Sequence, residues 1–104
     1  MIFIGGMNMK KTFKMMLCEG RHEIPDAVDG SIFGFDVDPL NPNGLEVEAV
    51  AKIKNLGIEK LDLYVTGLSV ALVAVLNAAK LTGVEIALYH YDKDSETYYR
   101  QNIR

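Results

Sequence analysis

The sequence predicts a three-layer α/β domain, with a parallel core sheet of about three strands and an antiparallel hairpin at its C-terminal edge. Apolar segments at 12–18, 60–66 and 84–91 have the length and composition of strands. Two segments with helical character, 45–56 and 68–81, separate them. Because strand, helix and strand in succession form a right-handed parallel crossover, we expect the three strands to lie parallel in one sheet.

The first helix has recognisable ends. We expect Asn43 to be its N-cap, because Glu46 follows three residues later in the capping-box position. Gly57 is placed to end the helix in a left-handed conformation. The apolar face has helical spacing and consists of Ala49, Val50, Ile53 and Leu56.

Turn residues define the remaining segments. Residues 19–31 carry turn residues at both ends and no sustained periodicity, which favours a long loop with at most a short helical turn. Segment 32–35 is a short apolar piece that suits a small strand, and 97–103 can return as an antiparallel edge strand. We expect 1–104 to be one small Rossmann-like domain to which residues 1–8 add little.

Composition limits the classes of function. A net charge of -3 provides no basic stripe for duplex DNA, although it allows one small anionic ligand. Cys18 is the only cysteine, so an intramolecular disulfide is impossible and a reducing, cytoplasmic location fits best. The uncharged segment 63–79 is at the short limit for a membrane helix, and its polar residues and strand-like start argue against spanning.

Polar clusters follow each of the three predicted strands, at 18–23, 66–69 and 90–92. Ligands of open parallel sheets collect at the carboxyl ends of the strands, so we expect these clusters to lie together around a ligand. Both histidines of the chain, His22 and His90, belong to this set.

The turn at 66–69 is the candidate anion-binding element. Free N–H groups at a helix start bind anions, and a glycine lets a ligand approach the backbone closely. Arg21 can hold a phosphate or carboxylate through two parallel hydrogen bonds. The turn carries neither the Walker A pattern nor the dinucleotide-binding glycine pattern. The candidate ligand-binding residues are Arg21, Thr66, Gly67, Leu68 and Ser69.

Each of these residues also has a purely structural interpretation. Gly67 can simply form the turn while Thr66 or Ser69 caps the helix. Arg21 can pair with Glu19 or Glu23 and fix the loop. These alternatives stay open at this stage.

A catalytic use of the same edge would depend on the histidines. His22 or His90 could act as general acid or base in phosphodiester hydrolysis, whereas a core or interface histidine is the structural alternative. Cys18 could be a nucleophile, but a small buried residue at a strand end is the more ordinary interpretation. No spacing matches a metal motif, and no cofactor is predicted.

The helix at 68–81 is apolar almost all round, and such helices are covered on more than one side. A second copy of the chain can provide part of that cover, which predicts a homodimer through this helix. The neighbouring helix together with the 19–44 segment is the alternative cover.

Three segments, 18–33, 61–77 and the hairpin start at 89–92, resemble a family of small uncharacterised proteins of bacteria, phages and mobile elements. This resemblance implies no activity. A weaker likeness, at the level of fold, is to the Rossmann-like domains of CRISPR-associated proteins that sense or cleave cyclic oligonucleotides. Those domains are dimers with a ligand site at the strand ends, and Thr66 and Gly67 are similar in placement.

The leading hypothesis is therefore a dimeric binder of a small anionic, nucleotide-like ligand. The alternatives are a phosphodiester-hydrolysing enzyme that uses the same pocket, and a structural or protein-interaction module.

Overall fold

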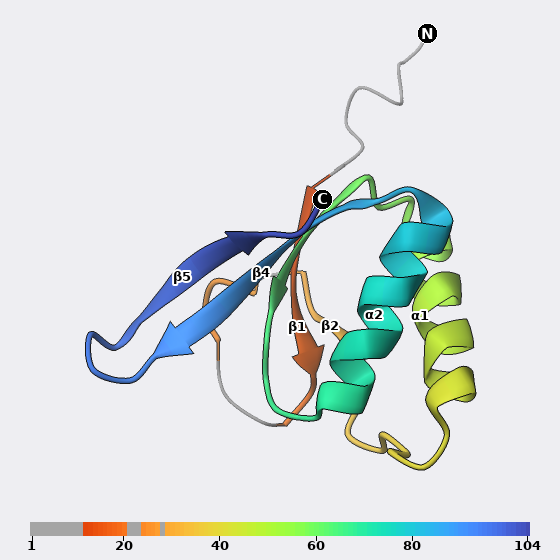
Figure 1. Ribbon diagram of the computed structural model, residues 1–104, viewed down its shortest axis with the longest axis horizontal. Helices are drawn as coiled ribbons and strands as arrows, with labels where there is room; N and C mark the ends of the chain where they lie inside the picture. Colours follow the sequence, from red (N-terminus) through yellow and green to blue (C-terminus); the bar gives the residue numbers. More distant parts are fainter. Residues whose placement is uncertain (1–11, 21–23, 28) are drawn as a thin grey trace, which may run out of the picture.

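The chain folds as a five-stranded mixed sheet with two helices (Figure 1), seen in a computed structural model that describes residues 12–20, 24–27 and 29–104. The sheet order is β2-β1-β3-β4-β5, in which β2, β1, β3 and β4 are parallel and β5 is antiparallel to β4. The predicted α/β fold with a parallel core and a C-terminal hairpin is confirmed. The elements are β1 (Thr12–Cys18), β2 (Ser31–Phe33), α1 (Pro42–Leu56), β3 (Lys60–Tyr64), α2 (Ser69–Thr82), β4 (Glu85–Asp92) and β5 (Thr97–Asn102).

The short strand β2 extends the parallel part of the sheet beyond the expected three strands. It lies beside β1, with Met16 opposite Ser31 and Cys18 opposite Phe33. Ile32 and Phe33 are buried against the core, which explains why so short a segment is held in place. Local sequence patterns do not predict the pairing of β2 with β1, because a long connection separates the two segments in the chain.

Both helices lie on the same face of the sheet and pack against each other (Figure 1). The steps from β2 to β3 and from β3 to β4 run in the same direction along the sheet, so right-handed crossovers place α1 and α2 on one side. Ile24 and Ala27, in the connection from β1 to β2, pack with Tyr64 against the opposite face. The described part of this connection therefore supplies a third layer on the face away from the helices.

Helix α1 begins two residues earlier than the capping pattern predicted. Its N-cap is Asn41 rather than Asn43, and the Asn41 Oδ1 accepts a hydrogen bond from the Gly44 N–H at 3.1 Å. Pro42 occupies the first helical position, where its fixed φ is favourable and its missing N–H is not needed. Gly57 ends the helix with φ 65°, as expected.

The main core lies between the helix pair and the sheet. Leu45, Ala49 and Ile53 form the buried face of α1, while Leu56, which was expected there, is partly exposed. Helix α2 contributes small side chains to this core, which allows α1 to approach it closely. The buried residues of α2 are Ala71, Ala74, Val75, Ala78 and Ala79.

Helix α1 supplies much of the cover that the apolar helix α2 requires. Val73 and Leu81 remain exposed on α2, so the homodimer through this helix stays a prediction. In the part of the chain that the structure describes, no helix is long and apolar enough to cross a membrane.

Candidate functional site

The carboxyl ends of β1 and β3 lie side by side, and the chain leaves them in opposite directions. The connection from β1 leads to β2 on one side, and the connection from β3 leads to β4 on the other. Such a switch point is where open α/β sheets leave room for a ligand. The sequence-predicted clusters at 18–23 and 66–69 begin at these two strand ends.

Thr66 ties the two strand ends together. Its side chain is 1% exposed, and its Oγ1 accepts a hydrogen bond from the Cys18 N–H at 3.3 Å. The hydroxyl is thus used within the protein, and it does not cap α2 as the structural alternative proposed. Sequence reasoning missed this role because the two partners are 48 residues apart.

The turn into α2 uses two successive left-handed residues. Gly67 has φ 56°, and Leu68, which is the N-cap of α2, has φ 49° and ψ 83°. Among the residues that the structure describes, no side chain caps the helix, and the first N–H groups with acceptors belong to Ala71 and Leu72, which both donate to the Leu68 carbonyl.

Two amides at the start of α2 remain available. Within the described ranges, the N–H groups of Ser69 and Val70 have no acceptor, as the first turn of a helix leaves them. A Cβ added to Gly67 would meet no atom of the described residues within 4 Å, so open space adjoins this backbone in that part of the structure. The turn therefore offers donors and room together.

The structure does not describe the proposed clamp or one of the candidate catalytic residues. Arg21 and His22, together with Glu23, are outside the described residues, so their roles stay predictions. Cys18 is fully buried in the main core, in agreement with its interpretation as a packed residue at a strand end.

The third predicted cluster, at 90–92, builds the β4–β5 hairpin. The His90 Nε2 lies 2.8 Å from the Gln101 Oε1, and its ring packs against Tyr99. The Asp92 carboxylate accepts hydrogen bonds from the Ser95 hydroxyl at 2.7 Å and from the Asp94 N–H at 3.3 Å, and these lower its pKa. The hairpin turn projects away from the start of α2 (Figure 1).

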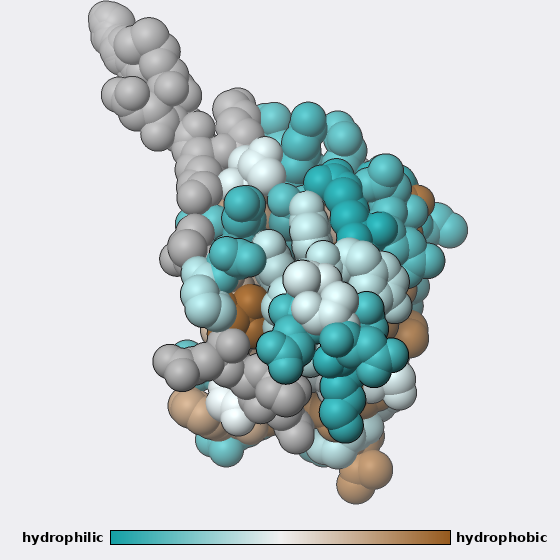
Figure 2. All heavy atoms as spheres, turned by 90° about the vertical axis from the view of Figure 1, so that its left-hand side faces the viewer, coloured by the Kyte–Doolittle hydropathy of each residue, from teal (hydrophilic) through white to brown (hydrophobic). Residues whose placement is uncertain are grey.

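A cluster of tyrosines covers the sheet face opposite the helices. Tyr64 stacks on Tyr89 at 4.7 Å between ring centroids and meets the edge of Tyr98 at 5.1 Å. Tyr91 extends the cluster to the hairpin through Tyr98. Burial, followed by the charge of Asp26, raises the pKa of Tyr64. The hairpin side of the molecule is mainly hydrophilic or intermediate in character (Figure 2).

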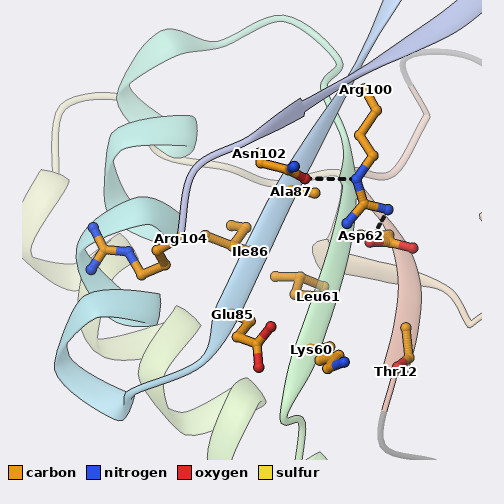
Figure 3. Close-up of a pocket in the computed structure, with 10 residues that line it drawn as sticks. All are labelled: Thr12, Lys60, Leu61, Asp62, Glu85, Ile86, Ala87, Arg100, Asn102 and Arg104. Carbon is orange, nitrogen blue, oxygen red and sulfur yellow. Dashed lines mark hydrogen bonds and ion pairs between the residues drawn. The ribbon is translucent and has the colours of Figure 1, made fainter.

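Arg100 is held in place by four groups around it. Its Nη1 donates to the Tyr89 hydroxyl at 3.1 Å, its Nε donates to the Asn102 Oδ1 at 2.7 Å, and its guanidinium lies 5.8 Å from the centre of the Tyr89 ring. An ion pair with Asp62 at 3.9 Å completes the arrangement (Figure 3).

Beside Arg100 lies a shallow hollow of about 440 Å³ at the amino ends of β3 and β4 (Figure 3). Lys60 and Glu85 line it at the strand starts, and Arg104 lines it from the chain end. Cations and carboxylates are mixed here, and Arg100 is already engaged, so the hollow has no single charge preference. No local pattern predicted this hollow, because only the hairpin register brings β5 beside these strand starts.

No family model, no curated protein and no solved structure matches this chain. The resemblances drawn from sequence motifs therefore stay predictions. Within the described ranges, no group of three His, Cys, Asp or Glu side chains is placed to hold a metal ion.

Proposed function

We propose that this chain is a small binding domain that takes an anionic, nucleotide-like ligand at the carboxyl ends of β1 and β3. One observation carries the proposal: the Ser69 and Val70 amides have no acceptor among the described residues and lie at the switch point of the sheet. A phosphate group is the anion that such a pair of amides fits.

The electrostatics of the turn support this proposal. Helix α2 has 14 residues and carries no acidic residue in its first turn, so no carboxylate of its own competes for the partial positive charge there. The open space beside Gly67 lets the ligand reach the backbone, and the Thr66–Cys18 hydrogen bond holds the ends of β1 and β3 together. Arg21 would add the permanent positive charge that the sequence predicts for this loop.

The test uses a charge placed on the turn itself. Ser69→Glu puts a carboxylate where the ligand phosphate would lie, and Ser69→Gln is its neutral control of the same size. Titrations with inorganic phosphate, mononucleotides and cyclic oligonucleotides, followed by thermal shift and calorimetry, should show binding to the wild type and to Ser69→Gln, and a loss of at least tenfold in Ser69→Glu.

Ser69→Glu should fold at least as well as the wild type, because an acidic side chain in the first turn stabilises a helix by about 0.3–1 kcal/mol. Lost binding therefore cannot be attributed to unfolding. If all three proteins bind a ligand equally well, that ligand lies elsewhere and the proposed site is wrong. Turnover of the bound ligand that depends on His22 or His90 would favour the hydrolase over the binder.

A further inference from the structure

We infer that the outer edge of β5 pairs antiparallel with β5 of a second copy about a two-fold axis at Tyr99, which joins the two sheets into one. This inference stands on the hairpin alone and does not depend on the proposed ligand site.

The main-chain hydrogen bonds on each side of β4 show which backbone groups of β5 face β4 and which face outward. Val65 N–H donates to the Tyr89 carbonyl, and Ile103 N–H donates to the Ile86 carbonyl. Because bonding alternates along an antiparallel pair, the even-numbered residues of β4 bond to β5. His90 is opposite Tyr99, so Tyr99 turns its backbone groups inward.

The backbone groups of Tyr98, Arg100 and Asn102 consequently point outward from the sheet. β5 is the last strand, and no residue in the ranges that the structure describes pairs with its outer edge. These N–H and C=O groups form a row that fits another strand.

The edge carries few of the features by which proteins block such pairing. Edge strands are usually short, or carry charged residues, proline or a bulge. β5 has six residues without lysine or proline, its one charged side chain, Arg100, is paired with Asp62, and the Tyr99 side chain at its middle is 56% exposed. The bulge that sets Ile103 and Arg104 against Ile86 lies beyond the end of the strand. The opposite edge of the sheet, β2, has only three residues.

Like charges disfavour one register between two copies, and the register centred on Tyr99 makes the strand complementary to itself. A two-fold axis at Arg100 would place two guanidinium groups opposite each other, which is unfavourable. An axis at Tyr99 instead sets Tyr98 opposite the partner's Arg100, and Arg100 opposite the partner's Tyr98. Both pairs join outward-pointing residues, so each exchanges two main-chain hydrogen bonds.

The side chains of both sheet faces suit this register. Arg100 already lies over the Tyr89 ring, and the partner's Tyr98 offers it a second aromatic ring. On the face of His90, Tyr99 meets the partner's Tyr99 in a non-hydrogen-bonded pair, where side chains come closest. Asp62 and Asn102 already hold the Arg100 side chain within one chain, so it loses little conformational entropy when two copies pair.

Charge swapping at Tyr99 tests the axis. We expect the wild type to be a dimer by light scattering at micromolar concentration, and Tyr99→Lys and Tyr99→Glu each to be monomeric. An equimolar mixture of the two should restore the dimer, because only this axis brings position 99 of both copies together. Val73→Lys, at an equally exposed apolar site on α2 (53% exposed), tests the rival contact through that helix and should remain a dimer when β5 forms the interface.

Cysteine cross-linking tests the register. Cys18 is fully buried, so new surface thiols can be compared without it. Under mild oxidation Tyr99→Cys should form a cross-linked dimer, since opposite residues in such pairs have the spacing of a disulfide. Thr97→Cys and Gln101→Cys should cross-link only when mixed. A monomeric wild type, a dimer that survives Tyr99→Lys, loss of the dimer in Val73→Lys alone, or cross-linking by Arg100→Cys in place of Tyr99→Cys would each overturn the inference.

Discussion

Thr66→Val is the substitution that most directly tests how the two strand ends are held. Valine has nearly the shape of threonine, so the buried site remains filled and the change is confined to the hydroxyl. What is lost is the acceptor for the Cys18 N–H at 3.3 Å, in a position where the side chain is 1% exposed.

The expected cost comes from that one bond. A neutral hydrogen bond contributes about 0.5–1.5 kcal/mol, and a buried donor that loses its acceptor adds to the cost. We expect a loss of about 2 kcal/mol in the free energy of unfolding, which lowers the Tm of a domain of this size by roughly 8–16 °C. Thr66→Ser keeps the hydroxyl and loses one methyl group, so it should cost only about 0.8 kcal/mol.

Amide hydrogen exchange distinguishes the loss of this one hydrogen bond from a general loss of stability. The Cys18 amide should exchange faster in Thr66→Val than in Thr66→Ser, after both rates are compared with the global stability of each variant. Ligand affinity should fall in Thr66→Val as well, because the turn at Gly67 loses the hydrogen bond that fixes it to the end of β1. Equal protection of the Cys18 amide in the two variants would show that the hydroxyl does not hold the strand ends, and the reasoning would fail.

Two further predictions concern the hairpin and the tyrosine cluster. Glu96 has φ 57° in the hairpin turn, so Glu96→Gly should relieve left-handed strain. After the entropy cost of glycine is subtracted, we expect a gain of about 0.5–1 kcal/mol in the free energy of unfolding, measured as a higher Tm. The control Asp94→Gly, at a residue without positive φ, should not stabilise the protein. The pKa of Tyr64 is raised above its ordinary 10.0, so above about pH 10 the unfolded chain loses its proton first and stability falls as pH rises. Tyr64→Phe should reduce this alkaline loss in urea unfolding, although Tyr98, whose pKa is also raised, should keep part of it; an unchanged slope would contradict the assignment.

The positions of the strands and helices could be predicted because the signals for them are local. The strand at 12–18 is found where its apolar segment lies, and Gly57 ends α1 where a left-handed glycine was expected. The start of α1 was missed because two asparagines precede the apolar face. Pro42, which suits the first helical position, identifies Asn41 as the cap, and the capping-box pattern at Asn43 obscured it.

The candidate site was predictable only in part, because its parts meet through pairing over long distances in the chain. Topology alone placed the ends of β1 and β3 together, and that expectation agrees with the Thr66–Cys18 hydrogen bond. The same argument placed His90 at this edge, yet its ring is engaged with Gln101 on β5. Strand order defines an edge of the sheet, but side-chain contacts across a hairpin decide which groups are free to bind.

The proposed ligand site and the proposed pairing edge lie on separate parts of the sheet, and this separation makes their tests independent. The proposed ligand site lies at the carboxyl ends of β1 and β3, while the pairing edge is β5, on the far side of β4. A carboxylate at Ser69 adds no charge to β5, so Ser69→Glu should remain a dimer while it loses ligand. Tyr99→Lys leaves the turn at Gly67 unchanged and should bind ligand as a monomer. If Tyr99→Lys instead lost both the dimer and the ligand, the second copy would have to complete the binding site, and a site formed by one chain would be ruled out.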